Sequence, residues 1–456
     1  MNSMTSIEAL MLIGIGTPAA LLIVLAGTSV LNRPLWEQWI GRLAAAAMMI
    51  SFAAIMTALL LYITTGTGTM LVSYGYWSTA HEGGIAIEFL LDGMSLTFAA
   101  LSAAIAGVVS AFSNRYLHRE AGYNRYFVLF AMFVTGILLV ALAGNVEVLF
   151  AGWELVGLSS ALLVAFFHDR TAPVGNALRV FSVYRISDAA MLSAAVLLHH
   201  VAGSGSLSLL FGRTAAAAGT GLSMTSATTI ALLLVVAAAG KSALLPFSGW
   251  LPRAMEGPTP SSAVYYGSLS IHAGCFLLLR AAPLLEQSTP ARLLAGTLGL
   301  ATALFSTLVT RVQSDVKSSL AYAALTQVGI IVVEIALGLY VIAFLHLAGH
   351  ACFRLLQFLS APNVLHDLHG LESAAGEHHA APTLARIETM IPERAQRALF
   401  LFALERGFLD AALDRAIVEP FHRVTGLMAR LDAFLCDVVI RRTPSTLVES
   451  GDERDE

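Results

Sequence analysis

Charged residues are scarce in this chain of 456 residues, and hydrophobic residues are abundant. Only 12% of the sequence is Asp, Glu, Lys or Arg, whereas 57% is hydrophobic. A soluble domain has about a quarter of its residues charged, so this composition excludes an ordinary soluble protein. The formal net charge of −4 also offers nucleic acid no basic surface. The composition predicts a multi-pass membrane protein.

Cysteine is rare too, with Cys275, Cys352 and Cys436 scattered along the chain. An odd and scattered set gives no disulfide framework and no spacing typical of a metal site. Cys275 and Cys352 lie in apolar stretches, where a free cysteine behaves as a small core residue. We therefore predict no metal site and no cofactor.

Lysine is almost absent, because Lys241 and Lys317 are the only lysines among the 26 basic residues. A GC-rich genome is the simplest explanation of this bias. Lysine nevertheless differs from arginine in that it can release its proton when it is buried. A lysine retained inside a membrane span therefore fits a group that exchanges protons.

Eleven apolar stretches are long enough to cross a bilayer, which takes about 20 residues. Their predicted limits are 8–31, 41–64, 90–112, 126–143, 146–167, 174–201, 226–249, 260–280, 291–310, 317–338 and 341–360. No basic stretch precedes the first run, so we interpret it as a retained span and not a cleaved signal. Arginines gather in alternate short loops, which predicts an N-terminus outside and a C-terminus inside.

Three regions follow from this pattern. Residues 1–360 are predicted to form an all-α transmembrane domain, and 361–390 a polar linker. Apolar residues return at helical spacing in 391–456, but among too many charges for a span. We expect cytoplasmic amphipathic helices there, lying on the membrane lipid or against a partner.

The seventh and eighth spans contain the most unusual stretch, residues 230–280. Lys241 lies inside the seventh span, and Pro246 and Pro252 are expected to break its helix. The eighth span contains His272. Broken helices at membrane depth border protein or water-filled cavities, and ionisable residues there are candidates for function. This stretch predicts an ion path.

The fifth and sixth spans contain further ionisable residues. Glu154 and Lys241 could form a switchable pair that couples proton movement to a neighbouring charge, or a static ion pair. The switchable pair is favoured, because a fixed buried pair can often be replaced by apolar packing. Arg185 and Asp188 share a helix face, whereas Arg179 points elsewhere, and structural and relay roles both remain open for these three.

The tenth and eleventh spans add a second polar group. Lys317 lies close to a membrane boundary, where snorkelling is the alternative to a relay role. Glu334 lies deeper, and His346, His350 and Arg354 recur every four residues on one helix face. Histidine titrates near physiological pH, so this stripe predicts a proton relay.

Several of these motifs together resemble one known family. The motifs are Trp153–Ser160, Gly240–Pro252, Gly257–Ala263, Asp315–Tyr322 and the His346/His350 pair. They are similar to the antiporter-like proteins, which include subunit L of respiratory NADH-quinone oxidoreductase and the corresponding component of multisubunit sodium/proton antiporters. The similarity covers roughly residues 86–360.

The resemblance implies proton translocation through half-channels built on broken helices. Glu154 and Lys241 would be the coupled pair, and His272, His346 and His350 would line a hydrated central path. Arg354 stands where the family usually has lysine. The family's second five-helix repeat needs spans nine to thirteen, so with eleven spans the second unit is expected to be incomplete.

Two segments, 265–274 and 352–367, resemble one branch of this family more closely. This branch is the membrane subunit of the two-component inorganic-carbon accumulation system. The resemblance implies a bacterial inner-membrane subunit without chemistry of its own, whose H+ or Na+ flow drives CO2-to-bicarbonate conversion. The conversion would be carried out by a large cytoplasmic zinc-containing partner resembling carbonic anhydrase. A proton-pumping subunit of a quinone oxidoreductase or hydrogenase complex, or a sodium/proton antiporter subunit, is the alternative.

Overall fold

The computed structural model describes residues 3–66, 68–78, 85–203, 205–207, 223–313, 315–375, 392–408, 411–412 and 414–441. The chain divides into two compact units, Met1–Phe408 and Leu409–Glu456.

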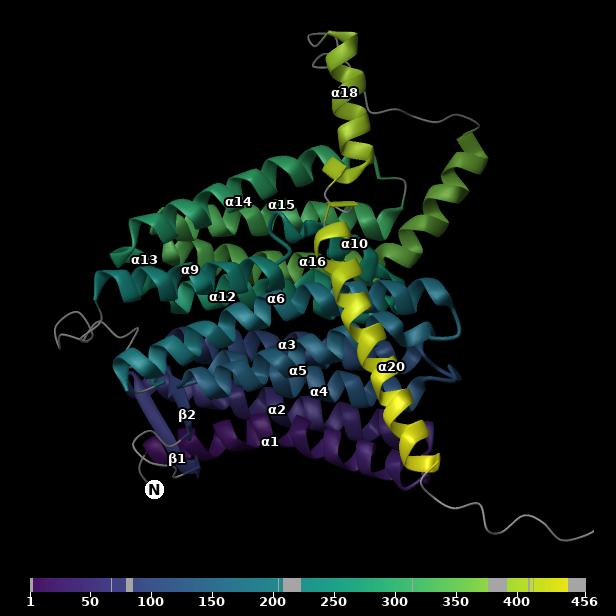
Figure 1. The fold of residues 1–456 in the computed structure, drawn as a ribbon. Helices are drawn as coiled ribbons and strands as arrows, with labels where there is room; N and C mark the ends of the chain where they lie inside the picture. The colour runs from purple at the N-terminus through teal and green to yellow at the C-terminus, as the bar shows by residue number, and fades with distance from the viewer. Residues whose placement is uncertain are drawn as a thin grey trace, which may run out of the picture. The chain divides into compact units, whose positions relative to one another are not determined.

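The first unit is a helical bundle, and within its described residues eleven helical stretches are long and apolar enough to cross a membrane. The long helices run side by side (Figure 1). They are α1 (Ser3–Val30), α2 (Glu37–Thr65), α3 (Gly93–Tyr116), α4 (Tyr123–Leu142), α5 (Val146–Val164), α6 (Thr171–Ala202), α9 (Met224–Lys241), α12 (Ser270–Arg280), α14 (Thr289–Thr310), α15 (Val316–Ala336) and α16 (Tyr340–Ala375). Short helices α10 (Trp250–Arg253) and α13 (Ala282–Gln287) lie in the connections, and α11 (Thr259–Ser261) begins the span that ends with α12. The predicted fold class and the eleven spans are confirmed.

Polar residues in the connecting loops fix where several spans begin. Asp92 and Ser95 form a reciprocal cap before α3, with the Asp92 side chain accepting from the Ser95 amide at 2.7 Å. The Asn145 side chain accepts from the Val148 amide at 3.0 Å and starts α5. Such caps satisfy amide groups that have no partner within the helix.

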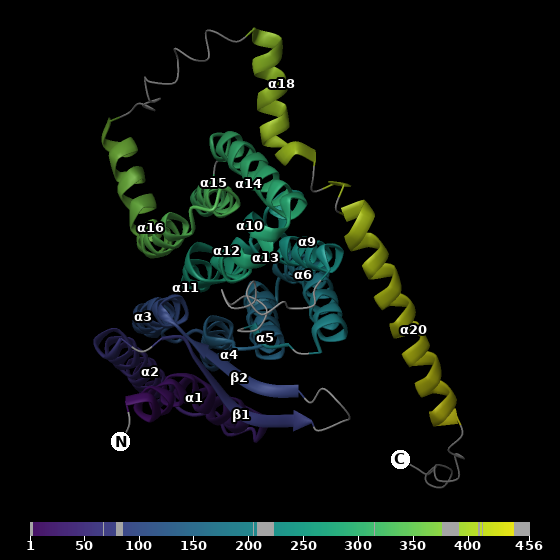
Figure 2. The same ribbon diagram turned by 90° about the vertical axis from the view of Figure 1, so that its left-hand side faces the viewer.

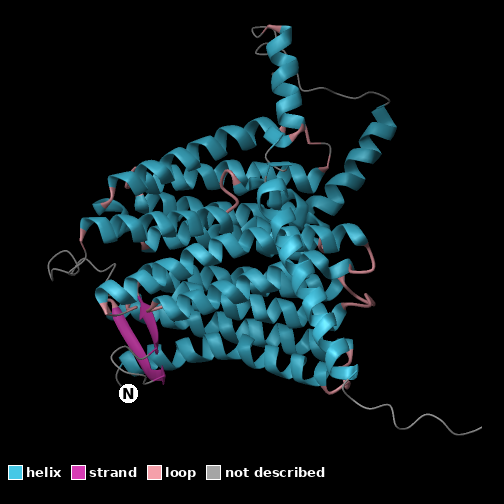
Figure 3. Ribbon diagram, in the orientation of Figure 1, coloured by secondary structure: helices cyan, strands magenta, loops and turns pink. Residues whose placement is uncertain are grey.

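A two-stranded antiparallel hairpin, β1 (Met70–Ser78) and β2 (Ile85–Leu91), interrupts the loop between α2 and α3. Figure 3 shows it at one end of the bundle. Phe89 forms a bridge to Ala143, and the Asn145 side chain donates to the Ala86 carbonyl at 2.6 Å. The sequence analysis did not predict this hairpin, which borders the beginning of α5.

A helix break around Lys241–Pro246 is confirmed, but its position relative to the prolines differs from the prediction. Helix α9 ends at Lys241 and not at 249, and Ala243 has a φ of +54°, in the left-handed region that non-glycine residues rarely adopt. Pro246 therefore follows the break, and Pro252 lies inside α10 and breaks nothing. A contact from beyond the break favours the early end, because the Trp250 indole donates to the Gly240 carbonyl at 3.0 Å and so satisfies a helix end.

The eighth span is continuous but irregular. It begins with α11, continues as a π-helical segment over Ser262–Ser268, and ends with α12. At the junction the Leu269 amide donates to the Val264 carbonyl and the His272 amide to the Leu269 carbonyl. Single π-helical turns are frequent at functional sites. This span is entirely buried in the bundle.

The C-terminal region is helical where the structure describes it. Helix α16 continues to Ala375, so 361–375 of the expected linker is helical, while 376–390 lies outside the described residues. Helix α18 (Glu393–Leu404) belongs to the first unit, where Phe402 packs edge-on against Phe305 of α14 with ring centroids 6.2 Å apart. The second unit contains the amphipathic α20 (Glu419–Arg441). The domain boundaries at 360 and 390 stay predictions.

Candidate functional site

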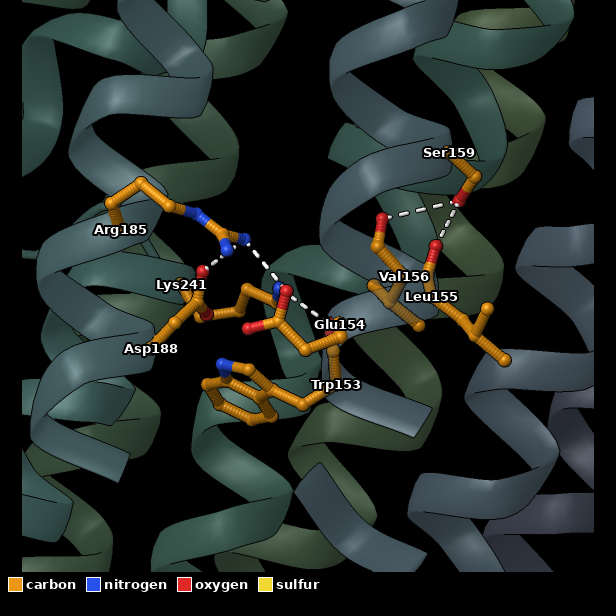
Figure 4. Close-up of polar contacts among 8 residues, drawn as sticks. All are labelled: Trp153, Glu154, Leu155, Val156, Ser159, Arg185, Asp188 and Lys241. Carbon is orange, nitrogen blue, oxygen red and sulfur yellow. Dashed lines mark hydrogen bonds and ion pairs between the residues drawn. The ribbon is translucent and has the colours of Figure 1, made fainter. Parts of the chain in front are cut away.

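Four ionisable residues from three spans meet inside the bundle. Glu154 lies on α5, Arg185 and Asp188 on α6, and Lys241 is the last residue of α9 (Figure 4). Figure 2 looks along the helices and shows α6 beside α9 next to α5. Glycine brings α5 against α4, because a Cβ on Gly152 would lie 2.7 Å from the Gly136 carbonyl oxygen.

Arg185 bridges the two carboxylates of this cluster. Its Nη2 lies 2.8 Å from Glu154 Oε2 and 2.6 Å from Asp188 Oδ2. The local pairing of Arg185 with Asp188 that the sequence predicted is confirmed. Arg179 lies earlier on α6 and is half-buried. With Lys241, the cluster holds two basic and two acidic groups, so it can be electrically neutral as a whole, which lowers the cost of burying it.

Lys241 is completely buried, and its ammonium binds to α5 through the backbone. Nζ donates to the Trp153 carbonyl at 2.9 Å and lies 4.9 Å from the Trp153 ring centroid and 4.6 Å from that of Tyr184. Gly157 makes room for it, since a Cβ there would lie 2.9 Å from Nζ. Aromatic faces and a carbonyl thus surround a desolvated cation.

The coupling of Glu154 with Lys241 stays a prediction. The structure brings both into one cluster, but the ion pair to Glu154 is made by Arg185. Lys241 bonds instead to the carbonyl of the preceding residue, Trp153. A guanidinium presents several donors in a fixed fork and can hold two carboxylates at once, which an ammonium at a helix end does less well.

The cluster retains unused hydrogen-bonding capacity. Glu154 Oε1, Asp188 Oδ1 and Arg185 Nε are buried and have no hydrogen-bond partner among the residues that the structure describes. Buried polar atoms are rarely left this way, and those that are commonly have a functional reason. These atoms are available to hydrogen-bond with water.

A second group lies between α12 and α16. His272 is fully buried, and its Nε2 lies 2.8 Å from Nδ1 of His350, while its Nδ1 lies 2.6 Å from the Ser268 carbonyl oxygen. Arg354 donates from Nε to His350 Nε2 at 3.0 Å and from Nη1 to Gln357 at 2.7 Å. The structure thus brings the predicted His272, His350 and Arg354 into one hydrogen-bonded chain.

The third histidine of the predicted set faces α15. His346 Nδ1 lies 3.0 Å from Glu334 Oε1, and its Nε2 lies 3.1 Å from Gln327 Oε1. The ring centroids of His346 and His350 are 6.3 Å apart, so the two histidines lie on one face of α16 as predicted. Lys317 has a different kind of partner. Its Nζ donates to the Gly257 carbonyl at 3.3 Å, in the segment between α10 and α11.

One ion pair of the described residues was not predicted from the sequence. Glu147, in the first turn of α5, pairs with His199 near the end of α6, and Gly205 lies so close that a Cβ would be 2.6 Å from Glu147 Oε1. Glu147 precedes Glu154 by two helical turns on the same face. That spacing was the signal in the sequence from which Glu147 could have been identified. No group of three or more His, Cys, Asp or Glu is placed to hold a metal within the described part of the chain.

Comparison with known proteins gives two family matches. The family model described as NADH:quinone oxidoreductase/Mrp antiporter, transmembrane, matches residues 143–381. The model of the N-terminus of NADH-ubiquinone oxidoreductase (complex I) chain 5 matches residues 77–127. The first match contains every residue of both polar groups.

Curated relatives include NADH-ubiquinone oxidoreductase chain 5 of Halichoerus grypus and of Loxodonta africana. The first is 32% identical over 348 residues, which are 76% of this chain and 55% of the relative. The second is 33% identical over 326 residues, which are 71% of this chain and 52% of the relative. The chain spans about half the length of the curated relatives that it matches.

Solved structures share the fold. A chain of the Mrp complex from Dietzia sp. DQ12-45-1b superposes with a TM-score of 0.65 and 28% identity, covering 77% of this chain and 37% of that one. A chain of the membrane-bound sulfane sulfur reductase, an archaeal respiratory membrane complex, gives a TM-score of 0.66 at 18% identity over 77% of this chain and 70% of that one. At that identity the second match shows the fold alone.

Proposed function

Because this multi-pass membrane protein belongs to the NADH:quinone oxidoreductase/Mrp antiporter transmembrane family, we propose that it translocates protons as one subunit of a larger membrane complex. The observation that supports this most is the Arg185 bridge between two carboxylates beside a fully buried lysine. One guanidinium is shared between the two carboxylates, so a proton on either of them changes which one Arg185 binds.

Sharing gives the cluster two arrangements. When Glu154 accepts a proton, it loses its attraction for Arg185, which then bonds to Asp188 alone. When Asp188 accepts the proton, the preference reverses. Lys241 lies next to this exchange, with its Nζ donating to the Trp153 carbonyl. Proton transfer between the carboxylates is thereby coupled to the position of Arg185 and to the charge of Lys241.

The histidines extend the proposed path across the bundle. Helix α9, which ends in Lys241, packs against α12, which contains His272. Ser242 ties the two helices together by donating from Oγ to the Ile271 carbonyl at 2.6 Å. From His272 the contacts continue through His350 to His346, which hydrogen-bonds to Glu334.

Replacing the buried lysine tests this function. We expect Lys241→Ala in lipid vesicles to lose proton flux by roughly tenfold or more, because removing a group that acts in transfer typically costs about 10²–10⁴-fold. Lys317→Ala is the matched control, because Lys317 contacts only the Gly257 carbonyl in the described hydrogen bonds and should retain most of the flux. Normal flux through Lys241→Ala would contradict the relay.

The partner is a second and separate proposal. We infer a bacterial inner-membrane location and a cytoplasmic zinc-containing partner that converts CO2 to bicarbonate, from the resemblance of segments 265–274 and 352–367. The relatives found by comparison instead come from respiratory and Mrp complexes, which favours those assemblies as the alternative. Mass spectrometry of the proteins that co-purify with the tagged chain separates the cases. A large soluble zinc protein supports the first, and quinone-reductase or Mrp subunits exclude it.

A further inference from the structure

Arg354 determines which ring nitrogen carries the proton in each of the two buried histidines, His350 and His272. Arginine has no hydrogen-bond acceptor, so the contact from Arg354 Nε must end on an unprotonated Nε2 of His350. His350 then carries its proton on Nδ1 and donates to His272 Nε2, 2.8 Å away. His272 in turn carries its proton on Nδ1 and donates to the Ser268 carbonyl.

The irregular backbone of the eighth span supplies the last acceptor. In a regular α-helix the Ser268 carbonyl would receive the amide of His272. Here the His272 amide donates to Leu269 instead, at 3.1 Å, after the π-helical turn. The Ser268 carbonyl is thus available to the His272 ring, and the chain of donors runs in one direction from Arg354 to Ser268.

In this arrangement neither ring can accept a proton. Both acceptor nitrogens already receive hydrogen bonds, and both protonated nitrogens already donate. His346 differs, because its two nitrogens face Oε1 of Glu334 and Oε1 of Gln327, and neither nitrogen contacts Arg354 in the described hydrogen bonds. A proton held at His346 therefore has no acceptor on His350 while Arg354 is in place.

We propose that Arg354 is a positioning residue that closes the histidine path between His346 and His272 by occupying Nε2 of His350. The guanidinium is well held, since it is 6% exposed and also donates to Gln357 on the same helix. Proton passage through the histidines requires Arg354 to leave His350. This inference rests on the proposed proton translocation, and it makes the histidine segment a gated branch of that path.

Nitrogen-15 solid-state NMR of histidine-labelled full chain in lipid tests the arrangement without any transport. We expect His272 and His350 to show proton-bearing Nδ1 and bare Nε2, with signals assigned by comparison with His272→Gln and His350→Gln. Arg354→Met should lose this pattern, and Arg354→Lys, which keeps a donor, should retain it. A proton on Nε2 of His350 in the unaltered chain would overturn the proposal.

Proton leak across vesicles tests the gate itself. Arg354→Met should raise the leak at least about tenfold, the factor that a charge-assisted hydrogen bond represents, and Arg354→Lys should stay near the unaltered chain. An unchanged or lower leak in Arg354→Met would overturn the gate. If instead the unaltered chain conducts no more than Lys241→Ala, the proposed function fails while the NMR result still decides the proton arrangement.

Discussion

Lys241 is fully buried, yet its hydrogen bond goes to a backbone carbonyl and not to a carboxylate. The two carboxylates of the cluster are both bound by Arg185. A fixed charge that stays ionised thus holds the acids, and the residue able to release its proton is left outside the ion pairs. Arginine thus binds the acids, and lysine remains able to release its proton. This is a physical reason for a lysine at position 241 in a sequence with few lysines.

Gly157 gives a direct test of the lysine position. A Cβ there would lie 2.9 Å from Lys241 Nζ, so Gly157→Ala should move the flexible ammonium off the Trp153 carbonyl without disturbing the backbone. We expect a stability loss of about 1–3 kcal/mol from the unpaired buried groups. Proton flux should fall severalfold. Thermal unfolding in detergent and vesicle flux measure the two effects.

Gly107→Ala is the matched control, since Gly107 lies inside α3 and a Cβ there would meet no atom within 4 Å. Alanine is the better helix former, so the control should be neutral or slightly more stable. Equal behaviour of the two variants would show that the contact between Lys241 and Trp153 is unimportant.

The candidate residues could be predicted from the sequence, but most of their partners could not. Ionisable side chains in apolar stretches are conspicuous, and four-residue spacing placed His346 and His350 on one face. The bond between His272 and His350 joins residues 78 positions apart, and no local pattern encodes it. The same holds for Lys241 and Trp153, which are 88 positions apart.

Among the helices and strands, α9 shows how tertiary contacts override a local signal. The prolines predicted a break near Pro246, but α9 ends earlier, at Lys241. Trp250 reaches back to the Gly240 carbonyl, and Ser242 bonds to the Ile271 carbonyl on α12. These contacts favour the early end and place the lysine at a helix terminus, where its side chain can reach α5.

Removing the indole donor tests this account. Trp250→Phe keeps an aromatic ring against Tyr184, whose centroid is 5.0 Å away, but leaves the Gly240 carbonyl without its donor. We expect a loss of about 1–3 kcal/mol in unfolding free energy, the usual cost of an unsatisfied buried group, and a lower proton flux. Trp36→Phe is the control, because Trp36 is 82% exposed. Unchanged stability in Trp250→Phe would show that the early end of α9 does not depend on this hydrogen bond.

For the whole molecule, the number of spans followed from hydropathy because each apolar run has the length that a bilayer requires. The β1–β2 hairpin was missed because its strands lie in a loop of mixed character between two spans, where they contact Gly144 and Asn145. The arrangement of α5, α6, α9, α12 and α16 around the charged residues depends on packing between spans, which a single sequence does not specify.

The second unit gives the last test, because α20 presents one unmistakable apolar stripe. Val424, Leu427, Leu431 and Phe434 recur at helical spacing and are all more than half exposed. Such a stripe is typical of a helix that docks on a partner or lies on a membrane. Leu431→Glu should therefore release the proposed cytoplasmic partner on purification, whereas Ala433→Glu, on the opposite face, should not.

Deleting 409–456 should also release the partner and leave the first unit folded, since the chain divides into compact units at this point. Proton leak and thermal unfolding of the truncated chain should therefore match the full chain. Partner retention by both Leu431→Glu and the truncated chain would place the docking surface elsewhere. Retention by the truncated chain alone would show that the added charge, and not the loss of the stripe, disrupts the complex.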